Sequence, residues 1–401
     1  MTEADTGERR SRIRPPTLRT GEDATASRLE LFFDLAYVLV VLELANAFYK
    51  DLSWRGLLVF VALYVAMWFS WVGFTLYANR FDTDDLVYRL AKLAAMLAVA
   101  GLAASVAEAT SNRAAQFAIC QFVLRLVLVG LYRRAYRHVV QARGVIAVYL
   151  VAEGFAALLW LAGAIAPTPL RYLCWALAVA GEAAAPILAT LRSAGLPLHV
   201  EHLPERFGLL IILVLGESVA AVAVGVHDTH WDPTTVAAAI LAFVVAASLW
   251  WTYFDLTGAA TTHTLSQRAG HRSSPLHDIY AYGHWPIALG LTAAGVGLEE
   301  AILHGNQPSL STGARWILAG GIALYLLSLT AIRGGIAGSL RSVLPWPAIG
   351  VPLILAIGLA SRFHPAAVLT AMALILVGEV ATGLAHQRQG RSTRTVPEDQ
   401  P

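Results

Sequence analysis

Charged side chains are scarce in this sequence. Asp, Glu, Lys and Arg together make up 14% of the 401 residues, whereas hydrophobic residues make up 57%. A soluble domain of this length does not carry so apolar a chain, because its surface needs polar side chains. We therefore interpret the protein as an integral membrane protein in contact with a lipid bilayer. The formal net charge of only +2 gives no sign of a nucleic-acid partner, and we expect none.

Cysteines are few and nucleotide-binding motifs are missing. Cys120 and Cys174 lie in separate apolar runs, so the sequence holds neither a disulfide framework nor a cysteine zinc site. It contains no P-loop or dinucleotide fingerprint, which argues against an ATP-driven pump built from this chain alone. The histidines of HDTH (227 to 230) have no third ligand at a typical zinc spacing. We expect no bound cofactor.

Long apolar runs, by contrast, are abundant. Runs of about 17 or more residues cross a bilayer core of about 30 Å as helices, so they predict an all-α transmembrane bundle. About twelve such spans lie near residues 30–49, 56–78, 87–107, 114–132, 145–166, 170–191, 207–226, 235–257, 281–303, 315–333, 344–361 and 365–386. If both termini are cytoplasmic, most of the 29 lysines and arginines fall in the tails and cytoplasmic loops, as the positive-inside rule requires.

Polar tails flank the apolar region. The first 26 residues lack the apolar stretch of a cleaved signal peptide, so we expect the first span to act as an uncleaved anchor. The chain is predicted to comprise a disordered cytoplasmic tail at 1–27, two six-helix halves at 28–195 and 196–387, and a polar cytoplasmic tail at 388–401.

The two halves share a sequence pattern that predicts an internal repeat. Aligning FFDLAYVLVVLEL with RFGLLIILVLGES places Glu43 on Glu217, and aligning YRLAKLAAML with YAYGHWPIAL places Lys92 on His284. With six spans in each half, the halves would run in the same direction, related by an axis along the membrane normal. Chance similarity between Ala- and Leu-rich helices explains the small residues, but it does not readily explain the repeated ionisable ones.

Ionisable residues occur at bilayer depth, where each costs about 2.5 to 3.5 kcal/mol on insertion scales. Those within or at the edge of the predicted spans are Glu30, Asp34, Glu43, Lys92, Arg125, Glu153, Glu182, Glu217, Asp255, His284 and Glu379. Glu30 and Asp34 are four residues apart and share a helix face. We predict a central polar path between the halves, lined by Glu30, Asp34, Glu43, Lys92, Arg206, Glu217 and His284. The alternative is a set of static ion pairs, for example Asp34 with Lys92, that lock helices together.

An acidic loop follows the second predicted span. Its DTDD sequence, with Asp82, Asp84 and Asp85, has the spacing by which some terpene cyclases protonate an alkene. It could instead hold Mg²⁺ and a lipid diphosphate, although the second acidic motif of such enzymes is absent. A solvated loop that caps a helix is the alternative that we favour.

Five stretches together resemble the bacterial low temperature requirement A protein family: LELFFDLAYVLVVLELA, NRFDTDDLVYRL, HLPERFGLLIILVLGESV, WWTYFD and YAYGHWPIALG. The resemblance runs from about Arg28 to His386. It implies a polytopic protein of the bacterial inner membrane, named for a cold-growth phenotype, and brings no agreed biochemical activity. The family's motif positions correspond to Glu30, Phe33, Asp34, Asp82, Asp85, Arg89, His202, Glu205, Arg206, Gly216, Glu217, Trp250, Tyr253, Phe254 and His284.

Three functional hypotheses follow. The leading one is a secondary transporter or permease that moves protons or small cations with an unknown small-molecule or lipid substrate. The second is a membrane enzyme acting on a lipid or isoprenoid at the DTDD loop, and only this hypothesis calls for Mg²⁺. The third is a membrane scaffold without catalytic activity. The sequence leaves the substrate and the oligomeric state open.

Overall fold

Nearly every part of the chain that the structure describes is helical. The structure is a computed structural model, and it describes residues 13–19, 27–192, 202–228, 231–258, 261, 263–264, 267, 275–339, 347–360 and 363–392. The first helices are α1 (Arg28–Tyr49), α2 (Trp54–Arg80), α3 (Leu86–Val106), α4 (Ala114–His138), α5 (Arg143–Ile165) and α6 (Leu170–Arg192). The remaining ones are α7 (His202–Asp228), α8 (Pro233–Tyr253), α10 (Pro275–Leu303), α11 (Thr312–Ala337), α12 (Pro347–Leu359) and α13 (Pro365–Ser392).

Eleven of these helices are long and apolar enough to cross a membrane. The predicted span at 344–361 corresponds to α12, which has 13 residues and is shorter than a bilayer core requires. The prediction of an all-α bundle of membrane-spanning helices is therefore confirmed. α13 continues beyond residue 387, so the last helix extends into the segment expected to be a polar tail.

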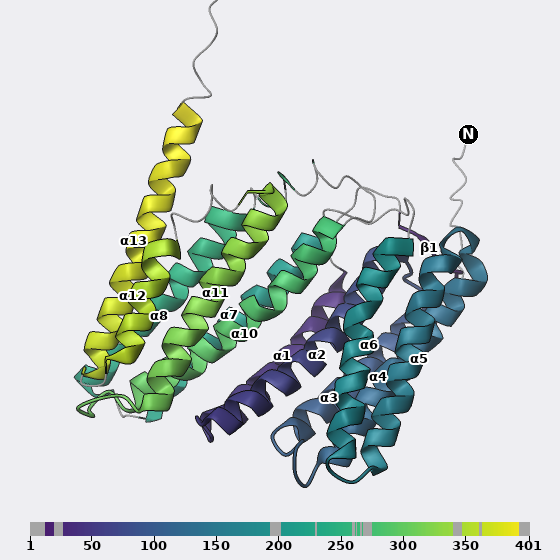
Figure 1. Ribbon diagram of the computed structural model, residues 1–401, viewed down its shortest axis with the longest axis horizontal. Coiled ribbons are helices and arrows are strands. Elements are labelled where there is room, and N and C mark those ends of the chain that lie inside the picture. Colours follow the sequence, from purple (N-terminus) through teal and green to yellow (C-terminus); the bar gives the residue numbers. More distant parts are fainter. Residues whose placement is uncertain are drawn as a thin grey trace, which may run out of the picture.

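The helices lie side by side, with α1, α2, α7 and α10 between an outer group of α3–α6 and an outer group of α8 and α11–α13 (Figure 1). Strand β1 (Thr17–Leu18) and the last turn of α13 lie at the same end of the bundle (Figure 1). In the described chain α1 packs on α3, and α7 packs on α10. A repeat would produce this pattern, but these contacts alone do not demonstrate one, so the repeat stays a prediction.

Helix α10 forms the most buried part of the bundle and packs closely against α11. A Cβ atom on Gly321 would lie 2.7 Å from the carbonyl oxygen of Gly290 and 2.7 Å from the backbone nitrogen of Ala294. Glycine is therefore required here for the two backbones to meet, which is the usual role of small residues between membrane helices. This contact holds α10 in place beside α7 and α1.

Part of the N-terminal tail is ordered. Strand β1 pairs antiparallel with β2 (Phe81–Asp82), in the loop between α2 and α3. The backbone N–H of Arg14 donates to Oδ2 of Asp85 over 3.2 Å. The expectation that residues 1–27 are disordered is therefore wrong for the described part of them. The tail forms hydrogen bonds with the backbone of this loop and with the carboxylate of Asp85, so these polar groups have partners.

Candidate functional site

Two helices that are distant in sequence meet at a buried ion pair. Nη2 of Arg206 on α7 donates to Oδ1 of Asp34 on α1 over 2.6 Å, and both side chains are fully buried. The indole Nε1 of Trp71 on α2 donates to the same oxygen over 2.8 Å. Asp34 and Arg206 each lie in the second turn of their helix, about 9 Å and about 6 Å from its start. The pair therefore lies inside the bundle, near the end where α1 and α7 begin.

Two further charged groups complete what we call the charge cluster, defined as Glu30, Asp34, Lys92 and Arg206. Nη1 of Arg206 lies 3.6 Å from Oε1 of Glu30. Glu30 also accepts the backbone N–H of Ser27 over 2.7 Å in a capping box, which fixes its carboxylate at the start of α1. Nζ of Lys92 on α3 lies 3.4 Å from the ring centroid of Phe33. The structure thus brings together four of the seven residues predicted to line a polar path.

The charge cluster has two acids and two bases, and some of its polar atoms lack hydrogen bonds. Among the described residues, no hydrogen-bond partner is present for Oδ2 of Asp34, for Nζ of Lys92, or for Nε and Nη1 of Arg206. Buried polar atoms normally have partners, so atoms left free in a well-packed protein call for water, a proton or a ligand. The free oxygen of Asp34 can accept a proton.

His284, the fifth predicted residue that faces the interior, lies next to the charge cluster and not within it. Its ring centroid is 4.8 Å from that of Phe207, the residue after Arg206. Nε2 of His284 is 2.9 Å from the hydroxyl of Tyr253, and Nδ1 is 2.6 Å from the carbonyl oxygen of Tyr280. Both ring nitrogens are thus engaged, which suits a histidine held in one orientation.

Glu43 and Glu217, the two residues on which the sequence argument relied most, are not seen in the cluster. Glu43 is exposed on the outer face of α1. Glu43 comes nine residues after Asp34, which at 100° per residue is about two and a half turns, so the two carboxylates point to opposite sides of α1. The expectation that Glu43 faces the interior is therefore wrong. The spacing between Asp34 and Glu43 in the sequence already indicated that they lie on opposite faces of the helix. The side chain of Glu217 lies outside the described residues, although its backbone belongs to α7.

A second group of charges, omitted from the predicted path, is buried at mid-length in α4, α5 and α6. We call Arg125, Glu153 and Glu182 the mid-helix cluster. Arg125 binds Glu182 in a bidentate pair, Nε to Oε1 over 2.7 Å and Nη2 to Oε2 over 2.5 Å. Nη1 of Arg125 donates to Oγ of Ser70 over 2.6 Å, and Nε1 of Trp160 donates to Glu182 over 3.2 Å.

Glu153 gives the mid-helix cluster one more acid than it has cations. It is only 4% exposed, and its Oε2 has no hydrogen-bond partner among the described residues. The sequence showed that all three residues lie in apolar spans, but no repeated or fixed spacing linked them. Only the packing of three separate helices brings them together.

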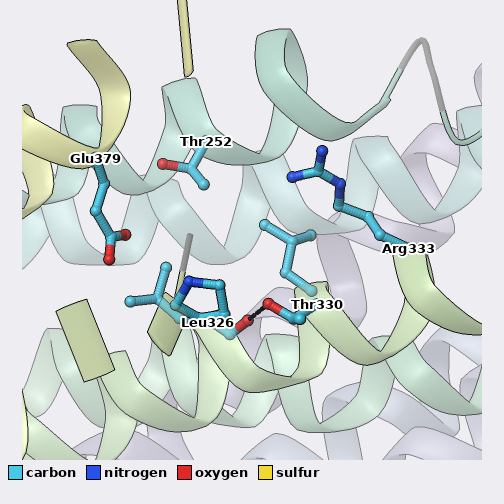
Figure 2. A pocket seen from close by; sticks show the side chains of 7 residues that line it. Thr252, Leu326, Thr330, Arg333 and Glu379 are labelled. Atoms are coloured by element: carbon cyan, nitrogen blue, oxygen red, sulfur yellow. Dashed lines mark hydrogen bonds between the residues drawn. The ribbon is translucent and has the colours of Figure 1, made fainter. Parts of the chain in front are cut away.

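A buried acid in the last helix faces a small cavity of about 20 Å³. Figure 2 shows Glu379 of α13 and Arg333 of α11 approaching it from opposite sides, with Thr252 between them. Oε1 of Glu379 has no hydrogen-bond partner within the described ranges. The volume is enough for about one water molecule. Within the described chain, Glu379 thus lacks the arginine pair that holds Glu182 in the mid-helix cluster.

The DTDD loop is held by arginines. Asp85 caps α3 by accepting the backbone N–H of Tyr88 over 3.0 Å, and Arg134 binds both its carboxylate oxygens over 2.9 and 2.7 Å. Asp84 is bound by Arg89 over 2.8 Å, and these hydrogen bonds lower the pKa of Asp84 below its ordinary value. The side chain of Asp82 is exposed. In this loop Asp85 thus caps a helix, and both Asp84 and Asp85 pair with arginines. This is the helix-capping alternative that the sequence favoured over an acid or Mg²⁺ site.

No group of three or more His, Cys, Asp or Glu side chains with metal-binding geometry occurs in the described part of the chain. The geometry thus offers hydrogen-bonding and proton-accepting groups within the bundle, on helices from both ends of the sequence.

Comparison with known proteins identifies the family. A family model for the bacterial low temperature requirement A protein (LtrA) matches residues 25–382. An uncharacterized protein of Rhizobium meliloti (strain 1021) is 25% identical over 307 residues, which cover 71% of this chain and 72% of the relative. No solved structure matches the chain. Because the family model covers most of the sequence, including both the charge cluster and the mid-helix cluster, this multi-pass membrane protein belongs to the bacterial low temperature requirement A family.

Proposed function

We propose that the protein is a secondary transporter or permease of the bacterial inner membrane, with both termini in the cytoplasm. It would couple a proton or a small cation to the movement of a small-molecule or lipid substrate. The observation that supports this is the charge cluster, where Asp34 of α1 and Arg206 of α7 form a fully buried pair while Oδ2 of Asp34 has no hydrogen-bond partner in the described chain. Intramembrane ionisable groups of this kind typically mark ion or substrate paths.

The pair offers a physical means of coupling. Protonation of Asp34 removes its charge and leaves the buried guanidinium of Arg206 with weaker compensation, because its second carboxylate, Glu30, is 3.6 Å away. An uncompensated buried charge is strongly unfavourable, so the protonated state would favour a different arrangement of α1 and α7. A proton could thus bias the relative position of helices from the beginning and the middle of the chain.

The test is flux through liposomes that contain the purified protein and a pH-sensitive dye. We expect a proton gradient to drive uptake of a substrate found by comparing metabolites of cells with and without the gene. Asp34→Asn should abolish the coupled flux. Glu43→Gln, on the opposite and exposed face of the same helix, is the matched control and should retain it.

Flux that persists in Asp34→Asn, or that is lost equally in Glu43→Gln, would refute the proposed role of the charge cluster. A static lock between helices, the alternative noted from the sequence, predicts lower thermal stability in Asp34→Asn and no proton flux in the wild type. Proton flux in the wild type separates these two outcomes, because both predict lower thermal stability in Asp34→Asn.

A further inference from the structure

A cleft with a volume of about 680 Å³ lies between α2 and α6. This volume is within the usual range for small-molecule pockets. Figure 1 shows the first helices running obliquely to α6. The walls are apolar and mostly small on the α6 side, where Ala176, Ala180 and Ala183 line the cleft. Small residues usually let membrane helices close on each other, but here they face open space.

One end of the cleft carries the charge of Arg55. This residue is in the first turn of α2, at the end of the bundle opposite to β1 and β2, and its side chain is exposed. No carboxylate in the described residues pairs with it, and its neighbour Trp54 is 78% exposed, as expected for an aromatic residue at a membrane interface. A guanidinium at headgroup depth matches a phosphate, which it can bind through two hydrogen bonds.

The depth of the cleft matches one leaflet. Along α2 it runs from Arg55 to Phe69, which is about 21 Å of helix, and one leaflet including its headgroup region is about 20 to 22 Å thick. Exposure of the α2 wall falls along this path, from 70% at Leu58 to 8% at Phe69, so the cleft is open near Arg55 and closed inside. Trp160 also lines the cleft and donates its indole N–H to Glu182 of the mid-helix cluster.

We propose that the cleft between α2 and α6 binds one acyl chain of an anionic bilayer phospholipid, whose phosphate pairs with Arg55. The chain would lie along the alanines of α6 and end near Phe69 and Trp160. A second apolar groove of about 370 Å³, between α7 and α8, has no charged residue in its lining and lacks this match to a headgroup. The proposal stands whether or not the protein is a transporter, because it concerns lipid binding alone.

Native mass spectrometry of the delipidated protein, with phosphatidylglycerol or phosphatidylcholine of the same chain length added, tests the proposal. We expect the wild type to retain one phosphatidylglycerol in preference to phosphatidylcholine. Arg55→Gln should remove most of this preference, whereas Lys50→Gln, an exposed cation at the same end outside the cleft, should keep it.

Filling the cleft is the second arm of the experiment. Ala180→Phe should lower phospholipid retention about tenfold or more, which corresponds to about 1.4 kcal/mol. Ala62→Phe on the opposite wall should do the same, and provides a second variant if the first is not monodisperse. Ala100→Phe, at an exposed position of α3 outside the cleft, is the control for added bulk.

Three results would overturn the proposal. Retention could fall equally in Arg55→Gln and Lys50→Gln, or Ala180→Phe and Ala62→Phe could bind lipid as well as Ala100→Phe does. Binding of free fatty acid without binding of phospholipid would show that the occupant is not a bilayer lipid.

Discussion

At the scale of single residues, arginines bind several of the buried carboxylates of this protein. Arg125 holds Glu182, Arg134 holds Asp85 and Arg206 holds Asp34, each over 2.5 to 2.7 Å at the closest pair of atoms. Arginine suits this task because its guanidinium stays charged and donates several hydrogen bonds in a fixed plane. Glu153 and Glu379 lack such an arginine, and each keeps one oxygen without a hydrogen-bond partner in the described chain, as Asp34 does at Oδ2.

The acid dependence of stability tests the role of Asp85, which lies outside the membrane-spanning helices. Burial alone would raise its pKa, but hydrogen bonds from Arg134 and from the backbone of Tyr88 and Arg14 together lower the pKa below its ordinary value. The carboxylate thus stabilises the folded protein fully above about pH 3.9, its ordinary pKa, and this contribution is lost as the pH falls through the lower folded value.

Asp85→Asn should therefore lower stability by about 1 to 2 kcal/mol at neutral pH and flatten the loss of stability on acidification. Thermal unfolding in detergent between pH 3 and 7 measures both effects. Asp82→Asn, at an exposed side chain in the same loop, is the control. An unchanged acid dependence in Asp85→Asn would show that the pair with Arg134 contributes nothing.

At the scale of helices, close backbone packing depends on a few glycines. Gly321 allows α11 to meet α10, and Gly297 lies where a Cβ atom would be 2.8 Å from the backbone of Leu318. Neighbouring glycines differ in this respect, since a Cβ atom on Gly320 would meet no other atom within 4 Å. Position on the helix, and not glycine content, decides which of them matter.

Gly321→Ala should destabilise the protein by about 1 to 3 kcal/mol, because the added methyl group meets backbone atoms that cannot move aside. Gly320→Ala, one residue earlier on the same helix, should leave stability unchanged or slightly higher, because alanine favours the helix. Thermal unfolding midpoints of the two variants in the same detergent make the comparison. Equal effects of both substitutions would contradict the close approach of α10 and α11.

At the scale of the whole molecule, the charge cluster joins the beginning of the membrane region to its middle. The Asp34–Arg206 pair connects residues that are 172 positions apart in the sequence. Because both side chains are buried, each depends on the other for compensation of its charge.

A double-mutant cycle measures this connection. Asp34→Asn or Arg206→Gln alone should lower the free energy of unfolding by about 3 to 5 kcal/mol, since each leaves a buried charge without its partner. The double variant should lose less than the sum of the two, with a coupling of about 1 kcal/mol or more. Strictly additive losses would mean that the two charges do not interact in the membrane.

The sequence by itself determined that this is a multi-pass helical membrane protein, because runs of apolar residues must become helices where no water satisfies the backbone. It also determined that Glu30 and Asp34 share a face, because four residues are close to one helical turn. Only the tertiary structure decided which residues meet in the charge cluster and in the mid-helix cluster. Trp71, Lys92 and Arg206 come from three other helices, and Arg125, Glu153 and Glu182 from three more, so their meeting depends on how the helices pack. The repeat pattern favoured Glu43, but packing turned it outwards, since a helix buries only the face that its neighbours cover.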